Sequence, residues 1–225
     1  MNLSTIVPWG RTLEEYSRFF ALTPAEIAGS RFLDCGGGPA SFTAEVVARG
    51  GNAIATDPIY EVSGADIRAR FEEVAPTIIK QVDDDRDVWC WDFFGDPAGL
   101  LAFRRRALEG FLADFDAGRE SGRYVAASLP SLPFPDDSFD VALSSHLLFL
   151  YSEHLSLDFH RAALKEMLRV AGEVRAFPLL SLHGGTSAHL QPMIDAFNAE
   201  GHTAELVPVN FEFRKGGREM LRLRR

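Results

Sequence analysis

The chain has 225 residues, of which 46% are hydrophobic and 24% are charged, so it can bury a core of its own. Its formal net charge of -9 repels phosphate backbones, and general nucleic-acid binding is not expected. No stretch approaches the ~18 apolar residues of a membrane span, and the first ten residues lack the pattern of a secretion signal. The two cysteines, Cys35 and Cys90, have no paired spacing, which favours a reducing cytoplasmic location over a disulfide framework or a metal site.

Two short helices are predicted at the start of the chain. Thr12 is followed by Glu15, and Thr23 by Glu26, at the spacing of a capping box, in which each side chain binds the other residue's backbone amide. Pro24 adds the preset backbone angle of a first helical residue.

A strand, a helix and a second strand are predicted next, over residues 31–34, 40–49 and 53–56. Gly50 and Gly51 supply a left-handed exit from the helix. A strand, a crossover helix and a parallel strand form the right-handed unit of an open α/β sheet.

More than sixty residues separate Asp57 from the next predicted strand, over residues 124–128, which exceeds the needs of one crossover helix. We expect a helical insertion over residues 61–122 of a single domain that spans residues 1–225. Pro76 is expected to kink or divide its first helix. The insertion is either a lid over a substrate or a contact between the subunits of a homodimer. Spacings of three and four between apolar residues predict its helices, through Ile67, Phe71, Val74, Ile78 and Val82 and through Leu101, Leu108, Phe111, Leu112 and Phe115.

The rest of the chain continues the alternation. We expect a strand over residues 141–144, a helix capped by Ser156 and ended by Gly172, a strand over 174–180 and a helix over 189–199. The last two strands, over 204–213 and 219–224, are separated by a four-residue turn that contains two glycines, so they must be antiparallel. The expected fold is α/β, with a doubly wound and mostly parallel sheet that ends in an antiparallel hairpin.

The most informative motif is Asp34-Cys35-Gly36-Gly37-Gly38, which follows the first strand directly. Glycines let a backbone pass close to a ligand, because they lack Cβ and tolerate positive φ. Asp57 ends the second strand 19 positions beyond Gly38, near the spacing at which nucleotide-binding α/β proteins hold a ribose. Together these residues predict a nucleoside pocket.

Four features in order resemble the class I S-adenosylmethionine-dependent methyltransferases: the glycine motif, Asp57, the segment Leu132-Pro-Phe-Pro-Asp-Asp-Ser-Phe-Asp140, and the terminal hairpin. The resemblance covers about residues 30 to 60 and 122 to 225. It implies a Rossmann-like sheet of seven strands. The runs Val7-Pro-Trp-Gly-Arg11, Asp57-Pro-Ile-Tyr60 and Ser144-Ser-His-Leu-Leu-Phe-Leu-Tyr151 further resemble a bacterial subgroup whose methyl acceptor is not identified.

The resemblance implies roles for particular residues. The backbone of Gly36 to Gly38, with Cys35, approaches the methionine and ribose parts of S-adenosylmethionine, and Asp57, followed by Pro58, accepts the ribose hydroxyls. Asp34 orders the loop and requires a partner if it is buried. Ser128 and Leu129 take the positions that contact adenine, although the family often has an acid where this chain has Ser128, and Ser144 ends the strand that faces the cofactor.

His146 is the candidate general base, because it follows a strand that ends at the ligand edge of the sheet and imidazole titrates near neutral pH. A structural histidine is the alternative. Tyr151, His154 and His183 are weaker candidates. Trp9, Arg11 and Tyr16 either close over the cofactor or pack beneath the first helix.

Three functions remain open: methyl transfer to a small-molecule acceptor, which is preferred; cofactor binding without catalysis, with the insertion recruiting a partner; and an NAD-dependent dehydrogenase. Ser41 replaces the last glycine of the NAD fingerprint, and the terminal hairpin argues against that third function.

Overall fold

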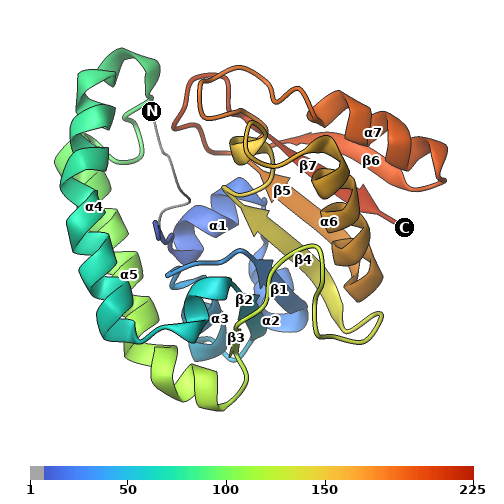
Figure 1. The fold of residues 1–225 in the computed structure, drawn as a ribbon, viewed down its shortest axis with the longest axis horizontal. Helices are drawn as coiled ribbons and strands as arrows, with labels where there is room; N and C mark the ends of the chain where they lie inside the picture. Colours follow the sequence, from blue (N-terminus) through green and yellow to red (C-terminus); the bar gives the residue numbers. More distant parts are fainter. Residues whose placement is uncertain (1–7) are drawn as a thin grey trace.

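A computed structural model describes residues 8–225, so Val7 lies outside the described residues. Its centre is a seven-stranded sheet in the order β3-β2-β1-β4-β5-β7-β6 (Figure 1). The strand β7 pairs antiparallel with both neighbours, and the other pairs are parallel. This confirms the predicted fold class. The strands are β1 (Arg31–Cys35), β2 (Asn52–Thr56), β3 (Tyr124–Val125), β4 (Phe139–Ser145), β5 (Ala171–Phe177), β6 (Thr203–Pro208) and β7 (Glu219–Arg224).

Helices cover both faces of the sheet, because its strands alternate apolar residues between the faces. Leu33 packs with α6 and α7 on one face, and Phe32 packs with α1 and α3 on the other. Both capping boxes, at Thr12 and at Thr23, are present as predicted. The helices are α1 (Leu13–Phe19), α2 (Pro24–Gly29), α3 (Phe42–Ala48), α4 (Gly64–Asp84), α5 (Pro97–Glu120), α6 (Leu157–Val170) and α7 (Leu190–Ala199), with short 3-10 turns η1 (Pro58–Glu61), η2 (Arg86–Val88) and η3 (Phe149–Tyr151).

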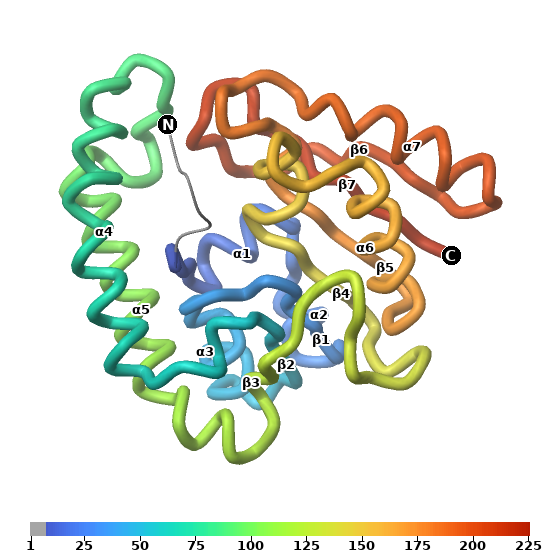
Figure 2. The backbone as a smooth tube through the Cα atoms, in the orientation of Figure 1, coloured from blue at the N-terminus to red at the C-terminus, as the bar shows by residue number. Residues whose placement is uncertain are grey.

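The expected helical insertion lies between β2 and β3 as two long helices, α4 and α5, that run side by side at one edge of the molecule (Figure 2). Pro76 does not divide α4, which is continuous. Its ring lies on the exposed side of the helix, while Phe71, Ala75 and Ile78 bury the other side, so packing outweighs the lost backbone hydrogen bond.

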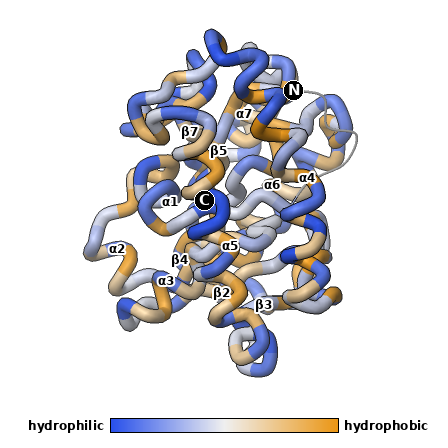
Figure 3. Tube along the Cα trace, turned by 90° about the vertical axis from the view of Figure 1, so that its left-hand side faces the viewer, coloured by the Kyte–Doolittle hydropathy of each residue, from blue (hydrophilic) through white to orange (hydrophobic). Residues whose placement is uncertain are grey.

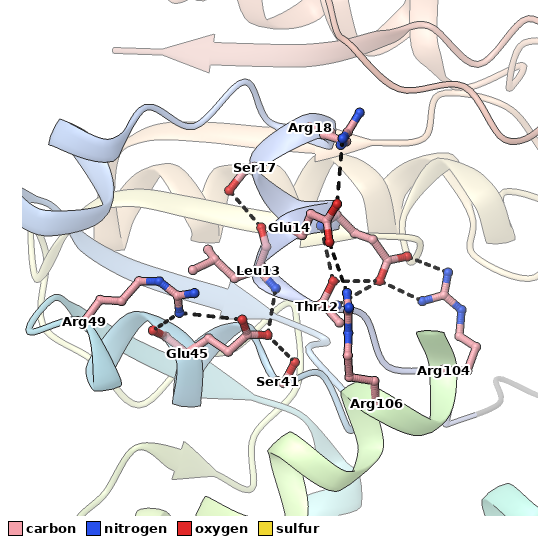
Figure 4. Close-up of polar contacts among 11 residues, drawn as sticks. Thr12, Leu13, Glu14, Ser17, Arg18, Ser41, Glu45, Arg49, Arg104 and Arg106 are labelled. Carbon is pink, nitrogen blue, oxygen red and sulfur yellow. Dashed lines mark hydrogen bonds and ion pairs between the residues drawn. The ribbon is translucent and has the colours of Figure 1, made fainter. Parts of the chain in front are cut away.

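A buried ion pair ties the insertion to the first helix. The guanidinium of Arg104 on α5 donates to the carboxylate of Glu15 on α1 at 2.6 Å, and their side chains are 4% and 0% exposed. Arg104 also donates to the carbonyl of Gly10 at 2.9 Å. Figure 4 shows Arg104 facing α1 from the neighbouring helix, close to Thr12. Glu15 therefore both caps α1 and neutralises a buried cation.

Several boundaries differ from the predictions, and three of the differences have a clear physical reason. β3 ends at Val125 rather than residue 128, because the chain turns back between Ser128 and Ser131 and leaves the sheet edge. β5 begins at Ala171 directly after α6, so Gly172 lies in the strand and does not end the helix. β6 stops at Pro208, which cannot donate to a ladder, and the segment 209–218, rather than a four-residue turn, leads to β7.

The colouring by hydropathy in Figure 3 shows hydrophobic segments along the strands and hydrophilic residues at the C-terminal end. None of the helices in residues 8–225 combines the length and the apolar character that crossing a bilayer requires.

Candidate functional site

A cavity of about 540 Å³ opens at the carboxyl ends of β1, β2, β4 and β5. Ligands bind at this edge in open α/β sheets. One part of its wall comes from the loops that follow these strands. The other comes from α1, the insertion and the segment 209–218. The structure thus places the ends of the predicted strands and the predicted insertion around one space.

The glycine loop follows β1 and lines this cavity. Gly36 and Gly38 have φ of 70° and 53°, the left-handed region that favours glycine. A Cβ on Gly36 would lie 2.5 Å from Leu147 Cδ2, and one on Gly37 would lie 2.6 Å from Asp34 Oδ2. Glycine is therefore required at these three positions, either by the backbone angle or by the close approach of a neighbouring side chain.

The amides of this loop are already bonded within the protein. Gly36 N and Gly37 N donate to Thr56 O at 2.8 and 3.2 Å, and Gly38 N donates to Asp57 Oδ2 at 2.9 Å. These amides are therefore not free to bind the carboxylate end of a cofactor. Carbonyl oxygens are what the loop can offer a ligand.

Asp57 lies at the end of β2 with its carboxylate in the cavity wall. Besides Gly38 N it accepts from Ile59 N at 2.9 Å, so it caps η1. Each carboxylate oxygen of Asp57 accepts a hydrogen bond from one backbone N–H and can accept a second hydrogen bond. Burial raises the pKa of Asp57, and the two amides oppose that shift. The side chain is thus held in one orientation with acceptor capacity left for hydroxyl groups.

Asp34 is 1% exposed and lies behind the glycine loop, outside the cavity lining. Its partner is Tyr16, whose hydroxyl donates at 2.9 and 3.1 Å to the two carboxylate oxygens. The expectation that a buried Asp34 has a partner is confirmed. Burial, together with the nearby Asp57 carboxylate, raises the pKa of Asp34 to about 7.

The other predicted cofactor residues divide into two groups. Pro58, Ser128 and Leu129 line the cavity, as do the glycines. Cys35 and Ser144 do not, because their side chains are buried within the sheet, at 0% and 1% exposure. The placement of Ser144 at the cofactor is therefore wrong, and the neighbouring Ser145 lines the cavity instead.

Arg11 brings a positive charge to the cavity wall. Its guanidinium donates to Trp9 O at 2.8 Å, and its buried Nε has no hydrogen-bond partner among the described residues. Burial and the neighbouring Arg104 cation lower the pKa of Arg11 to about 9, so it stays charged at neutral pH. A half-buried cation of this kind favours an anionic ligand group.

His146 lies in the cavity wall just after β4, with φ of 55°, an uncommon angle for a residue other than glycine. Its Nδ1 is 3.0 Å from Ser145 Oγ, and its ring contacts Phe19 and Phe177. Burial, with the cations of Arg11 and Arg104, lowers the pKa of His146 well below its usual value. The imidazole is therefore neutral at pH 7 and can accept a proton or a hydrogen bond.

Among the weaker candidates, Tyr151 lines the cavity, whereas His154 and His183 do not. His183 instead contacts Glu153, with 2.7 Å between Nδ1 and Oε1. Trp9 and Tyr16 line the cavity, and each also packs against another ring, Trp9 on Phe71 with 5.2 Å between ring centroids and Tyr16 on Phe42 with 4.4 Å.

Sequence reasoning missed much of the wall away from the glycine loop. Arg104, Trp89 and Arg214 all line the cavity. They come from the insertion and from the segment before β7, where no motif marks a site. The apolar periodicity of α5 was the nearest signal, because it showed which helix face is buried but not that an arginine lies on it. Within residues 8–225 no cluster of three His, Cys, Asp or Glu side chains could hold a metal ion.

Comparisons with known proteins agree with this arrangement. A family model described as a methyltransferase domain matches residues 108–173. The chain is 30% identical over 226 residues to the uncharacterized protein MJ0045 of Methanocaldococcus jannaschii, an alignment that covers 100% of this chain and 99% of that protein. The expected bacterial subgroup is not confirmed, since this relative is archaeal.

Solved structures are similar in fold. The mitomycin 7-O-methyltransferase aligns with a TM-score of 0.50 at 15% identity, covering 95% of this chain and 53% of that one. A magnesium protoporphyrin IX methyltransferase from Synechocystis PCC 6803, solved with bound S-adenosylmethionine, aligns with a TM-score of 0.49 at 9% identity, covering 95% and 77%. By its sequence relationship the chain belongs to the family of MJ0045.

Proposed function

We propose that this protein transfers a methyl group from S-adenosylmethionine to a small-molecule acceptor. The observation that carries the proposal is the paired geometry of the glycine loop and Asp57, which share one cavity at the carboxyl ends of β1 and β2. The methyltransferase-domain match supports it. The size of the cavity and the position of the insertion favour a small acceptor over a macromolecule.

The residues present fit this cofactor. Asp57 has the fixed orientation and acceptor capacity that two ribose hydroxyls need. Arg11 is a half-buried cation in the cavity wall that a methionine carboxylate would pair with. Ser128 and Leu129 line the wall next to Asp57 and Pro58, where the adenine would lie.

When bound, S-adenosylmethionine supplies a methyl carbon already activated by a positive sulfur. The protein therefore has to hold the reactants in line and exclude water. The aromatic residues and the insertion cover the cavity and provide that exclusion. His146 would accept the proton that an acceptor hydroxyl or amine gives up, since its imidazole lies in the wall at the end of β4.

Two other functions are less well supported. The order β3-β2-β1-β4-β5-β7-β6, with an antiparallel β7, differs from the 3-2-1-4-5-6 order of dinucleotide-binding sheets, which disfavours an NAD-dependent dehydrogenase. A protein that binds the cofactor without catalysis would keep the Asp57 contacts but would not need His146 in the wall.

Calorimetric titration with S-adenosylmethionine, S-adenosylhomocysteine and NAD tests the proposal. Asp57→Asn should weaken binding of both adenosyl compounds at least tenfold, because an amide cannot accept as strongly from two hydroxyls. Asn is preferred to Ala here, because its amide oxygen can still accept from one of the two backbone N–H groups that Asp57 binds, whereas alanine can accept from neither. Asp96→Asn, which alters an equivalent cap at the start of α5, is the matched control and should leave affinity unchanged. Uptake of NAD alone, or equal affinity in Asp57→Asn, would refute the assignment.

A further inference from the structure

The part of the cavity beyond His146 is walled by six aromatic side chains, which we call the aromatic chamber: Phe19, Trp89, Phe94, Phe177, Phe211 and Phe213. Phe19 stacks on Phe177 with 4.9 Å between ring centroids and meets Phe211 edge-on at 4.6 Å. Trp89 stacks on Phe213 at 4.7 Å. These rings come from α1, the insertion, the end of β5 and the segment 209–218, so four separate parts of the chain build one apolar surface.

The position of His146 links this chamber to the cofactor end. Its ring contacts Phe19 at 5.1 Å and Phe177 at 5.6 Å, both members of the chamber, while its backbone follows β4. Figure 2 shows the tip of the insertion, in green, and the segment before β7, in red, at the same end of the molecule. A bound acceptor in the chamber would therefore lie next to the candidate base.

Apart from Asp57 at the cofactor end, the charged side chains that line the cavity are all cations. Among the described residues that line it, Asp57 is the only acid, and it lies at the end of β2. Almost every arginine of the described chain forms an ion pair. The exceptions are Arg11, Arg119 and Arg214, and two of these, Arg11 and Arg214, line the cavity.

Arg214 is the cation of the aromatic chamber. Its guanidinium lies 4.9 Å from the centroid of the Trp89 ring and donates to His183 O at 3.1 Å. The Trp89 side chain is 9% exposed, and its enclosed Nε1 has no hydrogen-bond partner among the described residues, so Arg214 is the donor that a ligand in the chamber would meet.

We propose that the acceptor is an aromatic small molecule that carries an acidic group, with its ring in the aromatic chamber and its acid on Arg214. The proposal rests on the methyltransferase function above, which assigns Arg11 to the cofactor and leaves Arg214 for the acceptor. A protonated amine is disfavoured, because no carboxylate of the chamber wall would pair with it. An uncharged ring would fill the chamber but leave the charge of Arg214 without an acid to pair with.

The test uses the full chain saturated with S-adenosylhomocysteine, so that Arg11 is already engaged. Three probes share one ring system and differ in charge: 2-naphthoate, 2-naphthol and 2-naphthylmethylamine. Calorimetric titration should show 2-naphthoate binding about tenfold or more tightly than the other two. Equal affinity for the three, a preference for the amine, or no binding of 2-naphthoate would overturn the proposal.

Variants test where the carboxylate of 2-naphthoate binds. Arg214→Gln should reduce 2-naphthoate affinity to that of 2-naphthol, and Arg214→Lys should restore most of the difference. Arg218→Gln removes the same charge from the same segment, but Arg218 pairs with Glu212 and does not line the cavity, so it should have no effect. An unchanged preference in Arg214→Gln, with the fold verified by circular dichroism, would refute the role of Arg214.

The two proposals fail differently. A protein that binds S-adenosylhomocysteine but does not prefer 2-naphthoate retains the methyltransferase function and loses the acidic aromatic acceptor. A protein that takes up no S-adenosylhomocysteine but binds 2-naphthoate through Arg214 loses the methyltransferase function and keeps the acid site.

Discussion

At the scale of single residues, the site combines buried charges whose states differ from those in water. Asp34, Asp57, Arg11 and His146 lie within or just behind one wall, and burial is the first cause of every shift in their pKa values. For each group the shift favours the neutral form. A bound ligand with charges of its own would therefore change the protonation of this wall.

Asp34 allows a test of this electrostatic description in the free protein. Its folded pKa of about 7 lies above the ordinary value of 3.8, so the folded state holds this proton more tightly than the unfolded state. The stability that this group contributes is complete below about pH 4 and is lost as the pH rises towards 7. We expect the free energy of unfolding of the wild type, relative to Asp34→Asn, to fall between pH 5 and pH 7 and to level off above pH 7. Urea unfolding at several pH values measures this, and parallel curves for the two proteins would contradict it.

Gly37 provides a steric test at the same scale. A Cβ there would lie 2.6 Å from Asp34 Oδ2 and 3.0 Å from Tyr60 Oη, both buried groups. Gly37→Ala should lower the free energy of unfolding by about 1–3 kcal/mol, as overpacking does. Gly29→Ala is the control, because nothing lies within 4 Å of its added Cβ. A loss in Gly37→Ala no larger than in the control would show that the loop can move aside.

The part of the site that could be predicted from the sequence is the part made by local backbone. Gly36 to Gly38 and Asp57 lie at strand ends whose pattern is visible in sequence, and the structure brings them together. Arg104 and Arg214 could not be found in this way, since they reach the cavity only through the packing of α5 and of the segment 209–218. Ser144 shows a related error, because the side chains of a strand alternate and a shift of one residue moves the hydroxyl from the cavity into the sheet.

At the scale of elements, the packing of α5 of the insertion against α1 depends on the buried ion pair of Glu15 and Arg104. Replacing one partner of a buried ion pair leaves the other charge uncompensated. Glu15→Gln keeps a side chain able to cap α1, so its effect reports mainly the lost charge.

We expect Glu15→Gln to lower the free energy of unfolding by about 3–5 kcal/mol. Glu14→Gln is a matched control on the same helix, since Glu14 is 48% exposed and pairs with Arg18 and Arg106 at the surface. The control should cost at most about 1 kcal/mol. Chemical denaturation of both variants measures the difference, and losses of equal size would mean that the buried pair contributes no more than a surface one.

The elements themselves followed their sequence patterns where local signals were strong. Thr12 and Thr23 begin helices where their capping boxes predict, and the 3.6-residue periodicity located α4 and α5. The failures came where packing outweighs a local signal. Pro76 is tolerated in α4 because it faces solvent. Gly172 belongs to β5 because apolar neighbours such as Val174 are buried in the sheet there.

At the scale of the whole molecule, the cavity is enclosed by two segments that are distant in sequence. Cys90 N donates to Phe213 O at 2.7 Å, and Trp89 pairs with Arg214, so the insertion and the segment before β7 are directly bonded. The alternative of a subunit contact for the insertion stays a prediction, but its residues in the cavity wall support the lid.

Ligand binding should therefore be seen at both segments. With saturating S-adenosylhomocysteine and 2-naphthoate, amide hydrogen exchange should slow in residues 86–95 and 209–218, because closing over a ligand reduces their local opening. The helix α7, which lies among the residues of the other sheet face, should exchange at an unchanged rate. Slowing confined to the glycine loop would show that the two segments do not respond to the acceptor.

The position of β7 has a consequence for how the protein is made. This strand follows all the others in the chain, yet it lies between β5 and β6 rather than at an edge. A chain synthesised only as far as about residue 218 would therefore contain both neighbours of β7 but leave β6 unpaired and β5 without its second neighbour. Such a chain should not bind ligand, because β6 and the segment 209–218 would not be anchored to the sheet.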